Sequence, residues 1–136
     1  MIESICALLI FATGVLGIAR LQSVAVQQTS TAAFRTTAAM LAKNLVATMW
    51  LSDRTPGVLA ANFADTPPGS GYTAWLSTVT ASSLPGVAAM PPKVELVPIP
   101  GGGTTPVASV QATVTIWWKT PGETAIHKYV ETAQIK

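Results

Sequence analysis

The chain has 136 residues, which is room for one small domain and an appendage rather than two full domains. Only 10% of the residues are charged, and eight basic against six acidic side chains give a net charge of +2. Lys and Arg form no cluster of the kind that follows a phosphate backbone, so the composition argues against a nucleic-acid partner. The single cysteine, Cys6, excludes an intrachain disulfide, and within its apolar run it is expected to behave as a small buried hydrophobe.

The first nineteen residues form an almost uncharged apolar run. Glu3 is the only charged residue between Met1 and Ala19, and from Ile5 onward only Thr13 is polar. As a helix this run would be roughly 28 Å long, close to the hydrocarbon thickness of a bilayer. A signal peptide would begin with basic residues, and a buried core helix would show a polar face. The run therefore predicts a membrane span.

The helix is expected to continue well past the apolar run, because Leu21 to Leu51 contains neither Pro nor Gly. Its continuity is least certain over Ser23 to Thr37, which is rich in the mediocre helix formers Gln, Ser and Thr. Beyond this stretch, apolar residues recur at helical spacing and indicate a face laid on a sheet, with Val46 and Trp50 beside it: Phe34, Ala38, Leu41, Leu45 and Met49. Three polar residues fall mostly away from that stripe: Arg35, Lys43 and Asn44.

Pro and Gly punctuate residues 52–92, so a long connecting loop with short elements is expected there. Within it, Tyr72 to Val79 is compatible with either a short helix or a strand. A second Pro/Gly cluster, Pro98 to Pro106, contains the triplet Gly101 to Gly103. No Lys-Ser/Thr pair and no helical pattern follow the triplet, so a flexible loop explains it better than a phosphate-binding loop.

Three segments after residue 92 are typical of β-strands. Lys93 to Ile99 alternates in polarity, and its Pro98 suggests an edge position or a strand end. Residues 110–118 alternate with a clear period of two. Thr124 to Ile135 forms the last strand, whose apolar members are Ile126, Tyr129, Val130 and Ile135.

Pro121 and Gly122 suit the central positions of a type II turn, so the last two strands should form an antiparallel hairpin. The apolar face of this sheet and the stripe of the long helix need each other for burial. The predicted fold is therefore α+β: a long N-terminal helix, apolar in its first half, packed on a small antiparallel sheet. Residues 1–22 are assigned to the membrane-spanning half, and 23–136 to a globular domain with helix to about 51, loops over 52–92 and sheet over 93–136.

The sequence shows no catalytic constellation. His127 is the only histidine and is expected to face solvent in the last strand, and no further metal ligands lie near it in sequence. The six acids form no recognisable pair for acid–base work, and the many Ser and Thr lack an activating base. We therefore expect neither an enzyme nor a site for a metal, cofactor or small-molecule substrate.

Three residues of the apolar run carry the candidate functional chemistry. A carboxylate there is costly, so Glu3 either sits at the bilayer surface or pairs with a positive group on a neighbouring subunit, and the first turn of a helix favours its charge. Gly14 and Gly17 stand three residues apart. They indicate either close helix packing or a helix that loosens locally, since each costs about 1 kcal/mol relative to Ala.

One segment consists of Ile2-Glu3-Ser4, the apolar run, Gly14-Val15-Leu16-Gly17 and Leu21-Gln22. It resembles the N-terminus of a known family, the type IV pilins. The likeness is greatest to the PilV branch of minor pilins. The closing hairpin of that branch is similar to a second segment: Val114 to Trp118, Pro121-Gly122 and Ala133 to Ile135. Residues from about 52 to 92 carry no resemblance.

The resemblance implies a structural minor subunit of a type IV pilus, which primes assembly and joins a tip complex active in cell adhesion. The implied partners are other minor pilins, the major pilin, a tip adhesin and, before assembly, inner-membrane lipid. The implied location is the inner membrane, with one span and a periplasmic C-terminal domain, and then the extracellular pilus. Residues 1–22 would form the filament core after extraction from the membrane.

The resemblance also implies roles for individual residues. Glu3 corresponds to the family's glutamate that pairs with a neighbour's N-terminal amine, and Gly14 and Gly17 lie where the family's helices loosen in the filament. The family's basic leader is removed after a Gly and the new N-terminus is methylated. Met1 stands where the third mature residue is expected.

Two alternatives stay open. One is a minor pseudopilin of a type II secretion system, and the other is a membrane-anchored periplasmic interaction domain outside any filament. The second predicts that Glu3→Ala leaves function intact. By the positive-inside rule Arg20 favours the opposite topology, whereas the resemblance implies a periplasmic C-terminal domain.

Overall fold

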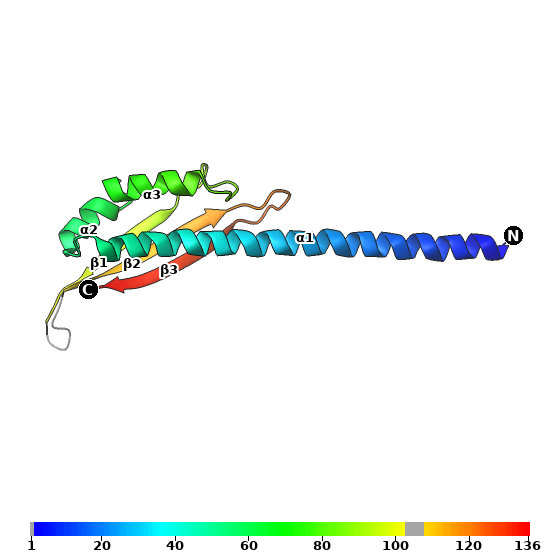
Figure 1. The fold of residues 1–136 in the computed structure, drawn as a ribbon, viewed down its shortest axis with the longest axis horizontal. Coiled ribbons are helices and arrows are strands. Elements are labelled where there is room, and N and C mark those ends of the chain that lie inside the picture. Colours follow the sequence, from blue (N-terminus) through cyan, green and yellow to red (C-terminus); the bar gives the residue numbers. More distant parts are fainter. Residues whose placement is uncertain (1, 103–107) are drawn as a thin grey trace. The chain divides into compact units, whose positions relative to one another are not determined.

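The computed structural model describes residues 2–102 and 108–136 (Figure 1). Its elements in chain order are α1 (Ile2–Leu51), α2 (Pro56–Phe63), α3 (Ser70–Thr80), β1 (Lys93–Ile99), β2 (Ser109–Trp118) and β3 (His127–Ile135). The predicted fold class is confirmed: a long N-terminal helix with an apolar first half accompanies a three-stranded antiparallel sheet. The later part of the predicted Pro98 to Pro106 loop, residues 103–106, lies outside the described residues.

Packing divides the chain into two compact units, one ending at Ala33 and one beginning at Phe34. Helix α1 runs without a break through both units, including the Ser/Thr-rich stretch where the sequence offered the least support for a helix. There the hydroxyls of three residues donate hydrogen bonds to carbonyls one turn back: Thr29 to Ala25, Ser30 to Val26 and Thr31 to Gln27, at 2.9–3.1 Å. Each hydroxyl shares an i−4 carbonyl with the backbone ladder, which satisfies the side chain but does not strengthen the helix.

The second unit has a closed hydrophobic core. From α1 it takes Ala38, Ala42, Leu45 and Met49, which are fully buried, with Phe34, Leu41 and Val46 packed around them. The predicted stripe is therefore confirmed, and the three polar residues placed away from it are exposed. The indole nitrogen of Trp75 in α3 donates to the Leu41 carbonyl at 2.9 Å, which ties α3 to this part of α1.

The sheet has the order β1-β2-β3, with both pairs antiparallel. The central strand β2 supplies the core with alternate residues, all buried: Val110, Ala112, Val114, Ile116 and Trp118. Val94 of β1 pairs with Val114 and is also buried. Pro98 lies in β1, which is an edge strand as predicted, because proline cannot donate to a second ladder. Figure 1 shows α2 and α3 on the β1 side of the sheet.

The segment 52–92 is more ordered than the expected loop, because it contains α2 and α3. The undecided stretch Tyr72 to Val79 is helical and lies within α3. Two of the Pro and Gly residues of segment 52–92 stand at helix starts: Pro56 opens α2 and Gly69 is the N-cap of α3. Proline is well tolerated at the first helical position, so this punctuation marks helix boundaries rather than the absence of helix.

The hairpin between β2 and β3 has the predicted turn. Gly122 has φ of 85°, and the Glu123 amide donates to the Thr120 carbonyl at 3.1 Å. The predicted start of the last strand at Thr124 is wrong, since β3 begins at His127. Ile126 is 59% exposed, which leaves it outside the core.

Tyr72 makes the second unit sensitive to alkali. Its hydroxyl donates to the Pro92 carbonyl at 2.8 Å, and burial together with the negative charge of Asp65 raises its pKa above the ordinary 10.0. A raised folded-state pKa adds stability that is complete below about pH 10 and is lost as the pH rises further. We expect the free energy of unfolding to fall above that pH, and to fall less steeply in Tyr72→Phe. Denaturant unfolding at pH values from about 9 to 11, a range centred on the usual pKa of tyrosine, measures the slope of the free energy of unfolding against pH in both proteins. Equal slopes would contradict the prediction.

Candidate membrane and assembly segment

The first unit exposes its apolar side chains along the whole of residues 2–21. Leu9 is 62% exposed and Phe11 is 70% exposed, in contrast to the buried stripe of the same helix further on. This part of α1 is long and apolar enough to cross a membrane, and none of its most apolar window is buried by the rest of the chain. Apolar surface of this extent is costly in water, so lipid or other helices must cover it.

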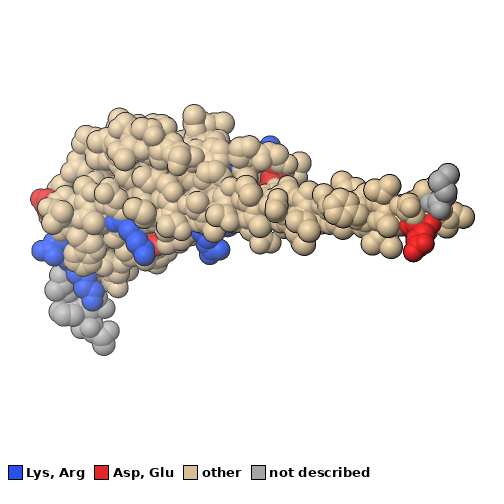
Figure 2. Space-filling view, turned by 45° about the vertical axis from the view of Figure 1, so that its right-hand side comes forward, with Lys and Arg blue, Asp and Glu red and all other residues tan. Residues whose placement is uncertain are grey.

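Glu3 lies in the first turn of α1 and is exposed. In Figure 2 the N-terminal end of the molecule shows one acidic group on an otherwise uncharged surface. The free amides of the first turn carry partial positive charge, which favours a carboxylate there. The structure thus places Glu3 in the first turn of the apolar run, with its side chain exposed.

Gly14 and Gly17 lie within α1, which is continuous across both. A Cβ atom added at either position would meet nothing within 4 Å. Thr13, beside Gly14, donates its hydroxyl to the carbonyls of Leu9 and Ile10. Packing within the described chain therefore does not explain glycine at these two positions, and close helix packing and local loosening both stay predictions.

Cys6 is exposed on the surface of α1, so the expectation of a buried side chain is not met within the chain itself. Its neighbours along the helix are apolar and equally exposed. Whatever covers the apolar run therefore also covers Cys6.

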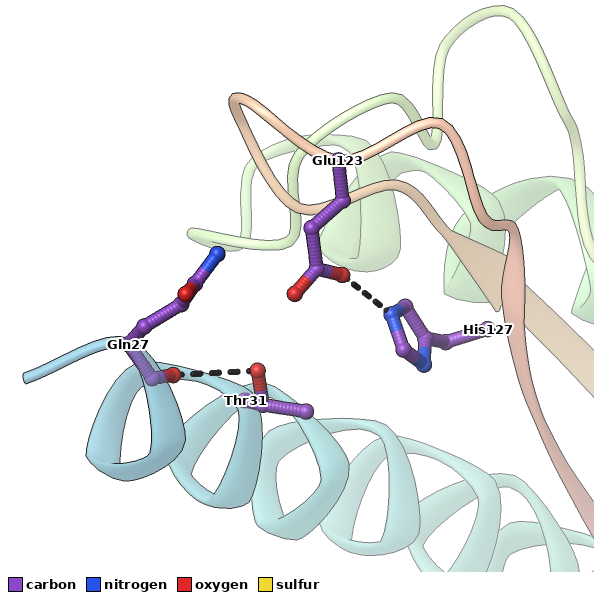
Figure 3. Close-up of polar contacts among 4 residues, drawn as sticks. All are labelled: Gln27, Thr31, Glu123 and His127. Atoms are coloured by element: carbon purple, nitrogen blue, oxygen red, sulfur yellow. Dashed lines mark hydrogen bonds and ion pairs between the residues drawn. The ribbon is translucent and has the colours of Figure 1, made fainter. Parts of the chain in front are cut away.

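His127 is half-buried, and the prediction that it faces solvent is wrong. It pairs across the sheet with buried Trp118 and stacks on that indole, with ring centroids 5.7 Å apart. Its Nε2 lies 2.6 Å from a carboxylate oxygen of Glu123 (Figure 3). The sequence missed this pair because Glu123 lies in the turn, outside any periodic pattern. Together the contacts fasten the turn to the end of β2.

Among residues 2–102 and 108–136 there is no group of three or more His, Cys, Asp or Glu able to hold a metal ion. Comparison with known proteins gives no match: no family model, no curated protein and no solved structure matches the chain. The functional hypothesis therefore depends on the residues and geometry of this chain alone.

Proposed function

We propose that this chain is a minor structural subunit of a type IV pilus, held in the inner membrane by its N-terminal span until it enters the filament. One observation carries the proposal: the apolar run of α1 is exposed along its length, although the second unit already has a closed core. Such a helix is suited to two successive environments, lipid before assembly and neighbouring helices afterwards.

Two further features support this function over a simple anchor. A plain anchor needs no acid in its apolar run, whereas an assembling helix can use Glu3 to pair with a neighbour's positive group. The second half of α1 is also part of the core of the second unit, so the folded domain and the apolar run are joined by continuous helix rather than by a flexible linker. In this proposal the second unit lies in the periplasm and, after assembly, on the outside of the pilus beside other minor pilins, the major pilin and a tip adhesin.

The test compares Glu3→Ala with wild type in filaments sheared from cells that express the tagged chain. A hydrogen bond to a charged group is worth about 1.5–3 kcal/mol, so loss of the Glu3 pair should lower the amount recovered in filaments about tenfold or more. The mutant should accumulate in the membrane fraction instead. Glu95→Ala is the matched control, because Glu95 is an exposed acid of the second unit whose partner is surface Lys93. This control should be recovered like wild type.

The other candidate functions predict different outcomes of the same experiment. A pseudopilin would be recovered with type II secretion subunits rather than with pilins. If wild type and both variants stay in the membrane fraction and no filament contains them, the filament proposal fails. A membrane-anchored periplasmic interaction domain would then be the better description.

A further inference from the structure

The tip of the β2–β3 hairpin is exposed, positively charged and partly apolar. Its exposed residues are Lys119, Pro121, Gly122, Thr124, Ala125, Ile126 and Lys128. Ile126 is the largest apolar side chain among them. The turn is held in shape by the contacts of His127 with Glu123 and Trp118 described above. The tip therefore presents one apolar side chain between two lysines from a fixed turn.

The two lysines of this tip are not paired with its one acid. Glu123 is engaged with His127 at 2.6 Å, whereas neither Lys119 nor Lys128 forms an ion pair with any residue in the described part of the chain. Figure 2 shows basic side chains in several places on the face of the second unit that is drawn. An anionic surface is the partner that complements two free lysines and an exposed isoleucine.

The tip lies at the end of the second unit that contains the first residues of that unit in sequence. The charge of Arg35 acts on the hydroxyl of Tyr129, which places the start of β3 near the first residues of this unit. The other end of β3 carries Lys136, which is about 25 Å away along the strand at the usual rise per residue. Only eleven residues separate Gln22, the end of the predicted span, from Phe34, and the twelve steps between these two residues measure about 18 Å in a helix.

We propose that this tip docks on the anionic headgroup surface of the bilayer that holds the span. The lysines at positions 119 and 128 contact acidic headgroups, and Ile126 enters the interfacial layer. The short tether keeps the tip within reach of that surface, and each lysine strengthens docking about fivefold, from the usual energy of a basic residue near an anionic membrane. The contact would hold the domain at the membrane until assembly. The inference rests on the membrane anchoring in the proposed function, and adds lipid charge as a partner of the folded domain.

The experiment uses the full chain in nanodiscs, with a nitroxide label at Thr124→Cys in a Cys6→Ser background. Discs of phosphatidylcholine are compared with discs that also contain phosphatidylglycerol. The readout is relaxation of the label by a neutral, water-soluble nickel chelate. We expect the label to be shielded in the anionic discs and accessible in the neutral ones, with the difference lost at high salt because exposed charges are then screened. Equal accessibility in both discs would overturn the proposal.

Two comparisons make the result specific. Lys119→Gln and Lys128→Gln should each raise accessibility in the anionic discs and together restore it, whereas Lys136→Gln, the loss of one charge beyond the far end of β3, should leave the label shielded. If Lys136→Gln raises accessibility as strongly as the two tip substitutions together, general electrostatic attraction to the membrane explains the shielding better than docking of the tip, and the proposal fails. A second sample labelled at native Cys6 reports on the span. Shielding of Cys6 in both discs with a free tip overturns docking alone, whereas an accessible Cys6 overturns the membrane anchoring itself.

Discussion

Gly69→Ala should destabilise the second unit by about 3 kcal/mol, near the upper end of the usual cost of overpacking. An added Cβ would lie 2.2 Å from the backbone oxygen of Asn62 and 2.5 Å from that of Ala61. Both atoms belong to α2, so relief requires a shift of the backbone rather than a side-chain rotation. The dihedral angles of Gly69, φ −77° and ψ 164°, suit any residue. The cost is therefore one of space, and denaturant unfolding in detergent would measure it.

Gly57→Ala is the matched control for this substitution. Gly57 lies in the first turn of α2, and a Cβ there would meet nothing within 4 Å. Alanine is the better helix former by about 1 kcal/mol at most, so this variant should equal or slightly exceed wild type in stability. If both substitutions change stability alike, the close approach of Gly69 to the end of α2 is not what the position requires.

Periodic segments of this chain could be predicted from sequence because one physical demand fixes each of them. The apolar stripe that includes Leu45 falls on a single face only if the segment is a helix. The alternating residues that include Val114 fall on a single face only if the segment is a strand. The turn at Gly122 follows from local chemistry, because proline before glycine suits its two dihedral requirements. In each case the nearest neighbours in sequence supply the decisive information.

The helices α2 and α3 were predicted only as short elements of undecided type, because two of their glycines act through space. Gly69 permits α3 to start against the end of α2, and Gly71 lies so close to the ring of Phe63 that a Cβ would be 2.5 Å from it. Such residues read as helix breakers in sequence, although here they make a tight corner between two helices possible. Only the packed structure shows that use.

The faces of β3 were ambiguous for a different reason. Of its expected apolar members, Tyr129 and Ile135 lie on one side, whereas Ile126 and Val130 fall at alternate positions on the other. Register decides the matter, because Ile135 pairs with Val110 and brings His127 to the core side beside Trp118. Val130 is consequently 46% exposed. The sequence alone carries no information about that pairing.

In the candidate site, too, the sequence could place some residues but not their contacts. The sequence could place Glu3 in the first turn and both glycines within the span, because hydropathy and the order of residues are enough for that. The proposed roles of these residues depend on other molecules, since an acid at the start of an exposed apolar helix would find its counter-charge on a neighbour or at a bilayer surface. The Glu123–His127 pair is invisible in the sequence because it joins a turn to a strand that begins only after it.

A leucine-to-alanine substitution should destabilise the second unit when it is made in the second half of α1 and have almost no effect on it when made in the first half. Leu45 is fully buried in the core, so Leu45→Ala removes packed methyl groups and should lower the free energy of unfolding by about 3 kcal/mol. Leu9 is 62% exposed in the first unit, and Leu9→Ala should change the unfolding of the second unit by less than about 0.5 kcal/mol. Denaturant unfolding of both variants in the same detergent, followed by tryptophan fluorescence, makes the comparison, because all four tryptophans belong to the second unit.

The matched pair separates the requirement for folding from the requirement for assembly within one helix. If the apolar run serves lipid and neighbouring subunits, as proposed, Leu9→Ala should leave the fold intact and act only on recovery in filaments. Leu45→Ala should lower recovery as well, but in proportion to its loss of folded protein. Equal destabilisation by both substitutions would mean that the second unit needs the first for its own core. The exposed run would then be part of the folded domain rather than a surface kept for other molecules.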